Sequence, residues 1–111
     1  HCELMRPAAE RFAASIEAIE WQEPSIALVQ NVSAAAVHDL ATLKRDLLEQ
    51  LYKPVRWVES IQCLASHGAT QLVECGPGKV LAGLNKRCAE GVTTYNLDTP
   101  DAFAAARAAL A

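Results

Sequence analysis

Three histidines and four cysteines are the side chains in this sequence best suited to proton transfer or nucleophilic attack near neutral pH. His1 stands directly before a segment with helical spacing, where an imidazole can serve as a general base, although a lone histidine also fits a surface or tag residue. Cys63 and His67 are four residues apart on a predicted helix. Because a metal site needs more ligands than this pair, we expect a core thiol and a helix-end histidine there. His38 is expected in a loop beside a helix cap.

The spacing of the cysteines argues against a cross-linked framework. No two of them form a C-x-x-C pair and their intervals are irregular; they are Cys2, Cys63, Cys75 and Cys88. We therefore expect free thiols, neither disulfides nor a zinc site, and a reducing cytoplasmic location.

Two further segments combine polar or flexible residues with a predicted strand end. Asn31, in VQNV, follows a strand, and a hydrogen bond that ties down the neighbouring loop is its expected role, with direct chemistry as the alternative. The stretch GPGKV (76–80) connects a strand to a helix, where free backbone amides can bind an anion. It lacks the phosphate-binding pattern G-x-x-x-x-G-K-[ST], so a tight turn that requires glycine is the favoured interpretation.

The helices that must position these residues are indicated by apolar spacing and by caps. The first has its apolar stripe at Met5, Ala8, Phe12, Ile16 and Ile19. A second begins after the N-cap Asp39, carries leucines at 40, 43, 47 and 51, and is interrupted by Pro54. The others are expected from residue 57 to the Gly68 stop, over 79–88, and after a start signal at residues 98–100.

Short apolar runs between the helices predict three strands, at 25–32, 71–75 and 92–97. Strands that alternate with helices indicate βαβ units, and hence an α/β fold with a parallel sheet. Three strands make a thin sheet, which suggests that part of the fold lies elsewhere.

Composition limits the class of protein. The chain has 111 residues, 51% hydrophobic and 21% charged, which suits a single globular domain over 1–111. Its formal net charge of −3 argues against a general nucleic-acid binder. No apolar run approaches the length of a membrane span.

Four blocks together resemble the C-terminal third of malonyl-CoA:acyl-carrier-protein transacylases. They are HCELMRPAAERF, LVQNV, QLYKPVRWVESI and VECGPGKVLAGLNKR, and they occur in the order and at the spacing of that family. The resemblance implies an α/β-hydrolase-like acyltransferase core of which this is the C-terminal part, without the ferredoxin-like subdomain of the family.

The resemblance also assigns roles to residues. In the family a serine in a G-H-S-L-G turn attacks malonyl-CoA, and the histidine of an H-x-x-L/M-M segment takes its proton; His1, followed by Leu4 and Met5, fits that segment. The group that orients the histidine is the main-chain carbonyl of the glutamine in Q-L-Y, here Gln50. The side-chain identity of Gln50 is expected to matter little. The implied substrates are malonyl-CoA and the phosphopantetheine thiol of acyl carrier protein, with no metal or redox cofactor.

The 111 residues contain no G-x-S-x-G nucleophile turn. We therefore expect a cut or missing stretch before His1, and no transacylase activity from the segment alone. Nor does it hold the arginine that binds the malonyl carboxylate in the family.

Three alternatives stay open at this point. One is an acyltransferase domain of a polyketide synthase, which the ending DAFAAARAALA disfavours, and another is the malonyl transferase of malonate decarboxylase. The third is a non-catalytic domain that binds a carrier protein or a partner subunit. Some basic residues could steer an acidic carrier protein, although a solvated surface is the default interpretation; they are Lys44, Arg45, Lys53, Arg56, Lys79, Lys86 and Arg87.

Overall fold

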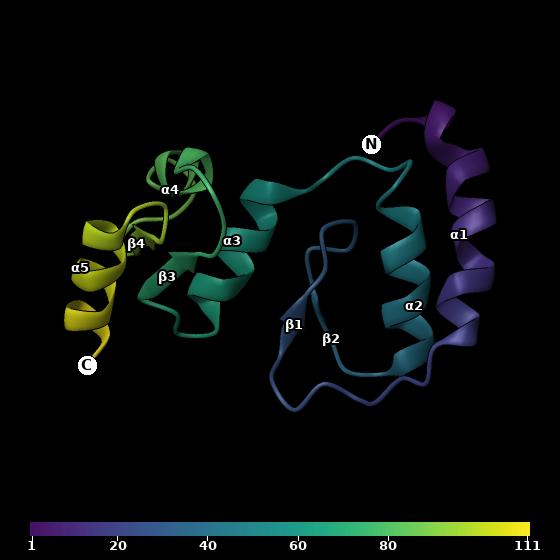
Figure 1. The fold of residues 1–111 in the computed structure, drawn as a ribbon, viewed down its shortest axis with the longest axis horizontal. Coiled ribbons are helices and arrows are strands. Elements are labelled where there is room, and N and C mark those ends of the chain that lie inside the picture. Colours follow the sequence, from purple (N-terminus) through teal and green to yellow (C-terminus); the bar gives the residue numbers. More distant parts are fainter. The chain divides into compact units, whose positions relative to one another are not determined.

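A computed structural model describes all residues from 1 to 111. Its internal contacts divide the chain into two compact units, His1–Cys63 and Leu64–Ala111 (Figure 1). None of the helices combines the length and the apolar character needed to cross a membrane.

The first unit is built around two helices and a small hairpin. Its elements are the 3-10 turn η1 (Glu3–Met5), helix α1 (Arg6–Ala18), strands β1 (Leu28–Val29) and β2 (Ala36–Val37), and helix α2 (Leu40–Glu49). The helices α1 and α2 lie side by side in Figure 1, and β1 and β2 pair antiparallel.

Helix α1 buries less of its predicted stripe than the spacing suggested. Ala9 and Ile16 are its buried residues, whereas Phe12 is 40% exposed and Ile19 is 54% exposed. Its apolar face is wider than the surface that α2 covers within this unit. Trp21, beyond the end of the helix, closes the last turn by donating its indole N–H to the Ile16 carbonyl at 2.8 Å.

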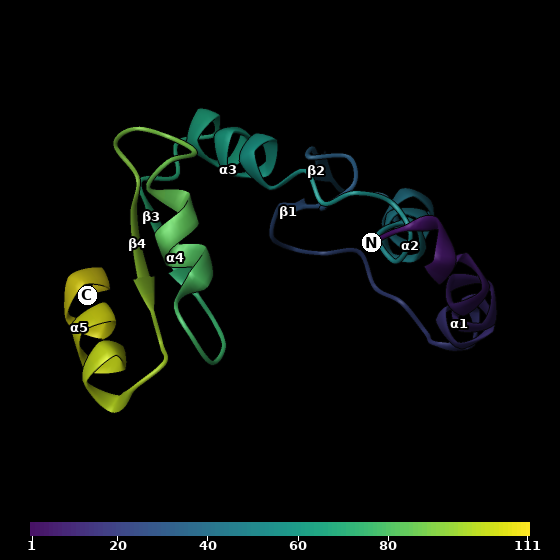
Figure 2. The ribbon, with the colours of Figure 1, turned by 90° about the horizontal axis from the view of Figure 1, so that it is seen from above.

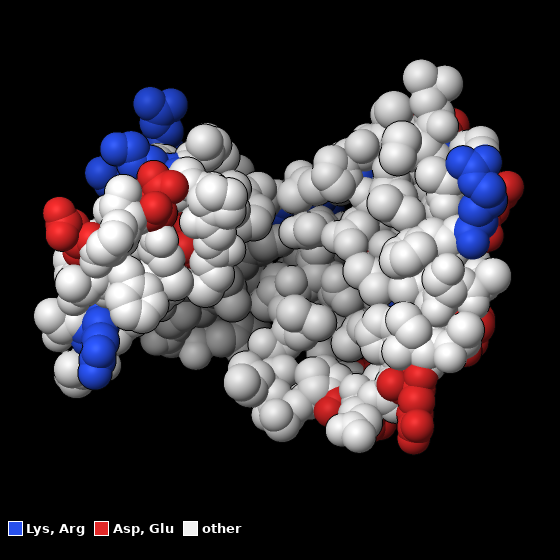
Figure 3. All heavy atoms as spheres, in the orientation of Figure 1, with Lys and Arg blue, Asp and Glu red and all other residues white.

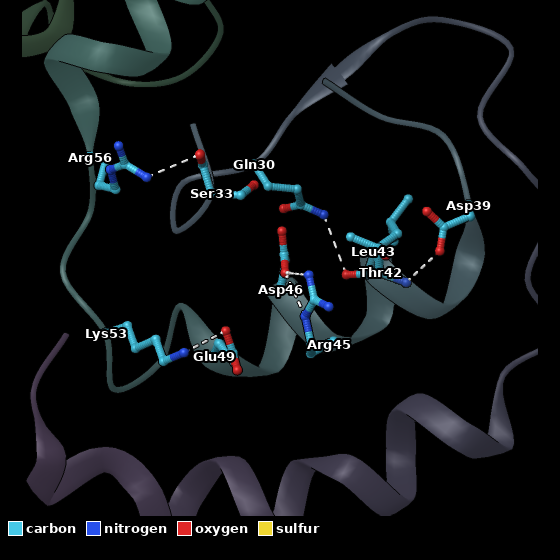
Figure 4. A network of polar contacts seen from close by, with 10 residues as sticks. All are labelled: Gln30, Ser33, Asp39, Thr42, Leu43, Arg45, Asp46, Glu49, Lys53 and Arg56. Atoms are coloured by element: carbon cyan, nitrogen blue, oxygen red, sulfur yellow. Dashed lines mark hydrogen bonds and ion pairs between the residues drawn. The ribbon is translucent and has the colours of Figure 1, made fainter. Parts of the chain in front are cut away.

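Helix α2 begins as its sequence predicts. The Asp39 carboxylate accepts the Thr42 backbone N–H at 2.8 Å, which is the bond expected of an N-cap and lowers the pKa of Asp39 (Figure 4). Leu43 and Asp46 are its buried residues. The Asp46 carboxylate, 1% exposed, accepts the Arg45 guanidinium at 2.8 Å and thereby raises the pKa of Arg45.

The predicted strand over 25–32 is wrong in length and in pairing. Only Leu28–Val29 is a strand, and it pairs with Ala36–Val37 in a hairpin instead of joining a parallel sheet. The hairpin turn is closed by the Ala34 N–H, which donates to the Gln30 carbonyl at 2.9 Å, with Ala34 at a φ of 51°. A continuous apolar run does not distinguish these two pairings, because both bury aliphatic side chains.

The second unit contains the parallel sheet. Helix α3 (Trp57–Ser66) begins in the first unit and ends in the second, where it is followed by β3 (Gln71–Glu74), α4 (Val80–Asn85), β4 (Thr93–Asn96) and α5 (Pro100–Leu110). β3 and β4 are parallel, with Gln71 opposite Thr93 and Glu74 opposite Asn96. Helices α4 and α5 flank the two strands, and β4 lies between them in Figure 2. The α/β class is confirmed, with two parallel strands instead of three.

Most predicted helix ends of this unit are also confirmed. Gly68 has a φ of 91° just beyond α3, and the Thr99 hydroxyl caps α5 by accepting the Ala102 N–H at 3.1 Å. α4 is shorter than the predicted 79–88, because the N–H groups of Arg87 and Cys88 bond three residues back, to Leu84 and Asn85. Such bonds tighten the end of a helix into 3-10 turns.

Candidate active site

The end of helix α2 leaves the main-chain carbonyl of Gln50 without a helical partner. The Lys53 N–H bonds to the Glu49 carbonyl at 2.8 Å, so the next donor in the helical series would belong to residue 54 and would reach Gln50. Residue 54 is proline, which has no N–H. The Gln50 carbonyl therefore stays available to a donor from elsewhere in the chain.

The donor that occupies this carbonyl is the imidazole of His1. Its Nδ1 is hydrogen-bonded to the Gln50 main-chain oxygen. A carbonyl oxygen only accepts, so Nδ1 must carry the proton, and in the neutral ring Nε2 then holds the free electron pair. His1 is exposed, and a neutral imidazole in this tautomer can accept a proton at Nε2.

The Gln50 side chain is held as well as its main chain. Asn31 donates its amide to Gln50 Oε1 at 3.0 Å, and the Asn31 main-chain carbonyl accepts the Arg56 N–H at 2.8 Å. The Arg56 guanidinium in turn donates to the Ser33 carbonyl at 3.2 Å (Figure 4). The hairpin turn thus bonds to both ends of the segment from 50 to 56, which contains the carbonyl that His1 contacts.

The structure therefore brings together His1 and Gln50, which are 49 positions apart. It also gives Asn31 the loop-tying bond expected of it. The Gln50 side chain also takes part in this network, because its amide oxygen is the acceptor for Asn31. Sequence reasoning missed Ser33 and Arg56 in this network, since neither forms a local motif with its partner.

An open apolar pocket of about 180 Å³ lies between α1 and α2 in the first unit. Its lining residues are Arg6, Ala9, Glu10, Ala13, Leu48 and Tyr52. The Arg6 guanidinium lies 4.1 Å from the centre of the Tyr52 ring and pairs with Glu3, which lowers the pKa of Glu3. These contacts fix the start of α1 at Arg6, one short turn after His1.

The GPGKV turn is occupied by the chain's own carboxylates. Glu74 accepts the N–H groups of Leu81 and Ala82 at 3.3 and 2.8 Å, and Asp98 accepts the N–H of Gly78 at 2.6 Å. Gly78 has a φ of 89°, which favours glycine. The turn interpretation is confirmed, and the amides of Gly78, Leu81 and Ala82 already have acceptors.

The other histidines and cysteines form no second centre. No three potential metal ligands come together anywhere in the 111 residues. His67 Nδ1 is 3.4 Å from the Ser66 hydroxyl, and the thiol of buried Cys88 donates to the Leu84 carbonyl at 3.3 Å. All four cysteines are free thiols, as predicted.

Comparison with known proteins gives close relatives. The chain is 41% identical over 106 residues to a malonyl CoA-acyl carrier protein transacylase of Salmonella typhimurium, covering 96% of this chain and 34% of that protein. A Bacillus subtilis protein of the same name is 41% identical over 101 residues, covering 91% and 32%. No family model matches the chain.

Solved structures agree with these relatives. A malonyl-CoA:acyl carrier protein transacylase from Xanthomonas oryzae superposes with a TM-score of 0.92 at 43% identity, over 98% of this chain and 35% of that one. A malonyl-transacylase in complex with a type II polyketide acyl carrier protein gives a TM-score of 0.87 at 36% identity, over 96% and 34%.

A histidine oriented by a main-chain carbonyl, in an α/β chain with these relatives, defines a segment of an acyltransferase. More narrowly, the chain belongs to the family of malonyl-CoA:acyl-carrier-protein transacylases. It spans about a third of the length of the curated relatives it matches.

Proposed function

We propose that these 111 residues supply the general base of a malonyl-CoA:acyl-carrier-protein transacylase of fatty acid synthesis. The observation that carries the proposal is the hydrogen bond between His1 Nδ1 and the Gln50 carbonyl. It commits Nε2 to the unprotonated form that a base requires, in a chain whose relatives bear this name. The proposal includes a cytoplasmic location and a reaction without a metal or redox cofactor, which is what the resemblance to this family implies.

In the first half-reaction His1 activates a serine supplied by the remainder of the enzyme. Nε2 takes the hydroxyl proton as the serine oxygen attacks the malonyl thioester. The carbon–sulfur bond then breaks, and Nε2 returns the proton to the departing CoA thiol. During this cycle Nδ1 keeps its proton, because the Gln50 carbonyl accepts from it. The product is a malonyl ester of the serine.

In the second half-reaction the same nitrogen serves the other substrate. Nε2 takes the proton of the phosphopantetheine thiol of acyl carrier protein, and the sulfur attacks the serine ester. The serine leaves with the proton that His1 returns to it, so the base and the serine are regenerated. One base suffices for both halves because each half removes one proton and returns one.

The partners of this reaction are malonyl-CoA, acyl carrier protein and the remainder of the same enzyme. Support for the carrier protein comes from the similar malonyl-transacylase that is in complex with its acyl carrier protein. Support for the remainder comes from the relatives' length and from apolar side chains at the surface: Leu4 is 89%, Ile26 80% and Val80 72% exposed. Residues other than Lys, Arg, Asp and Glu also cover much of the face drawn in Figure 3.

A chimera tests the proposal. These 111 residues would replace the matching third of the Salmonella typhimurium relative, and transfer of labelled malonate from malonyl-CoA to holo acyl carrier protein would be measured. We expect transfer by the chimera, and none by the isolated 111 residues, which contain no nucleophile turn. A folded chimera that binds carrier protein but transfers nothing would contradict the proposal and favour a non-catalytic binding domain.

A further inference from the structure

Asn31 is the residue that connects the hairpin turn to both ends of the segment carrying the Gln50 carbonyl. Its side-chain amide donates to Gln50 Oε1 at 3.0 Å. Its main-chain carbonyl accepts the Arg56 N–H at 2.8 Å. A second pair of atoms, the Arg56 guanidinium and the Ser33 carbonyl at 3.2 Å, reinforces the same connection (Figure 4).

The backbone of the segment from 50 to 56 has little conformational freedom. Pro54 has its φ held near the value that its ring allows, and the N–H groups of Tyr52 and Lys53 both bond to the Glu49 carbonyl. The peptide plane after residue 50 is the part that sets where the Gln50 oxygen points. The hydrogen bond from the Asn31 amide to Gln50 Oε1 holds the side chain of residue 50 from outside helix α2.

The direction of that oxygen matters for the chemistry of His1. If the oxygen turns away, the Nδ1 proton loses its acceptor, and the imidazole divides between its two neutral tautomers. Only the tautomer protonated at Nδ1 has Nε2 free to act as the base. A wrong tautomer disables a Ser–His pair even where its geometry is otherwise intact.

We propose that Asn31 is a positioning residue, which acts through its bond to the Gln50 side chain to keep the His1 imidazole protonated at Nδ1. The proposal rests on the proposed function for its catalytic consequence, but its effect on His1 itself is measurable without any reaction. In this role Asn31 acts through Gln50 and is not itself a catalytic residue.

The first test is nitrogen NMR of the chimera described above, labelled with ¹⁵N-histidine, which reports the tautomer of each histidine. We expect wild-type His1 to be protonated at Nδ1. Asn31→Leu, of similar volume but without the amide, is expected to give His1 a mixture of tautomers, whereas His38 and His67 are internal references in the same spectrum. A His1 signal unchanged by Asn31→Leu would overturn the proposal.

Two variants of Gln50 test the same hydrogen bond by changing its acceptor. Gln50→Met removes the acceptor and is expected to reproduce the Asn31→Leu mixture, while Gln50→Glu keeps an acceptor oxygen and is expected to retain the wild-type tautomer. Gln71→Met makes the same chemical change in the second unit, where Gln71 donates to the Ala109 carbonyl, and is the matched control. If Asn31→Leu fails to fold, the Gln50 pair decides: equal spectra for Gln50→Met and Gln50→Glu would overturn the proposal.

The second test is kinetic and uses the chimera described above. Asn31→Leu is expected to lower kcat by about ten- to a hundredfold with KM for malonyl-CoA unchanged, as for a displaced catalytic group. The double variant Asn31→Leu/Gln50→Met should lose no more than either single variant, because both break one bond. Additive losses would overturn the proposal.

The two tests separate the two proposals. A wild-type chimera without activity, together with a tautomer change in Asn31→Leu, would refute the transacylase function and leave the positioning role standing. An active chimera whose Asn31→Leu variant keeps the wild-type tautomer and kcat would refute the positioning role alone.

Discussion

The unpaired backbone groups at the end of helix α2 and at the start of helix α4 have different kinds of hydrogen-bond partner. At α4 the free N–H groups of Leu81 and Ala82 are taken by the carboxylate of Glu74, a residue of the adjoining strand. At α2 the free carbonyl of Gln50 is kept from helical pairing by Pro54 and bonds to His1. Both ends satisfy the same requirement, that helix termini find partners for their last backbone groups.

The difference shows how a structural helix end can be distinguished from a functional one. The partner at α4 is a carboxylate within the same strand–turn–helix segment, and its bonds only stabilise the turn. The partner at α2 is a titratable ring 49 positions away, and the bond selects which of its two nitrogens is basic. We therefore expect mutations at α4 to change stability and mutations at α2 to change activity.

The largest effect is expected from the ring itself. His1→Ala in the chimera should lower kcat for malonyl transfer by about 10³-fold, which is the usual contribution of a general base. Its fold should not change, because His1 is exposed. His38→Ala removes an exposed histidine of the same unit and is the matched control. Equal transfer rates for the two variants would show that His1 is not the base.

The second prediction concerns the carboxylate of Glu74 at the start of helix α4. Glu74→Ala leaves two N–H groups of α4 without acceptors and should lower the free energy of unfolding by about 2 kcal/mol. Glu74→Gln keeps one acceptor oxygen and should lose less. Urea denaturation followed by circular dichroism measures both. At a temperature where it is folded, the Glu74→Ala chimera should keep its kcat. A large loss of kcat would contradict the expectation that mutations at α4 change stability alone.

A third change should weaken the α2 site without unfolding it. Pro54→Ala provides an N–H that can bond to the Gln50 carbonyl and compete with His1. Because such a bond is worth about 1 kcal/mol, kcat should fall about fivefold. Stability should change little, since the lost proline rigidity and the new bond offset each other. Pro100→Ala, at the first turn of α5, is the matched control and should leave kcat unchanged.

The smallest effect concerns the other end of α2. The Thr42 N–H lowers the pKa of the Asp39 carboxylate. A carboxylate with a lowered pKa in the folded chain stabilises it above the ordinary aspartate pKa, and this contribution is lost as the pH falls through the lowered value. The melting temperature of the wild type relative to Asp39→Asn should therefore fall on going from about pH 5 to about pH 3, around the ordinary aspartate value. A difference independent of pH would contradict the assignment.

Helix boundaries were the most predictable part of the fold. Asp39, Gly68 and Thr99 perform the capping roles that their residue types indicate, because a cap depends on atoms only a few positions away. The strand over 25–32 was mispredicted, because strand pairing depends on a distant partner. Its actual partner, Ala36–Val37, has no strand signal of its own.

The candidate site was predictable only through the family resemblance. That resemblance pointed to His1 and to the Gln50 carbonyl, and the structure brings these two groups into hydrogen-bond contact. It did not indicate that the Gln50 side chain also bonds to Asn31. Composition and periodicity carry no information on such a contact, because a glutamine near a helix end usually faces water.

By itself the sequence determined the caps, the glycine turns and the absence of a nucleophile turn, since each depends on neighbouring residues alone. It also determined that Gln50 would lack a helical donor, because Pro54 has no N–H to give. Only the tertiary structure decided what would use that carbonyl. The choice required the chain to return from α1 through the hairpin to α2, so that His1 and Asn31 meet Gln50, and such meetings depend on packing between segments rather than on local spacing.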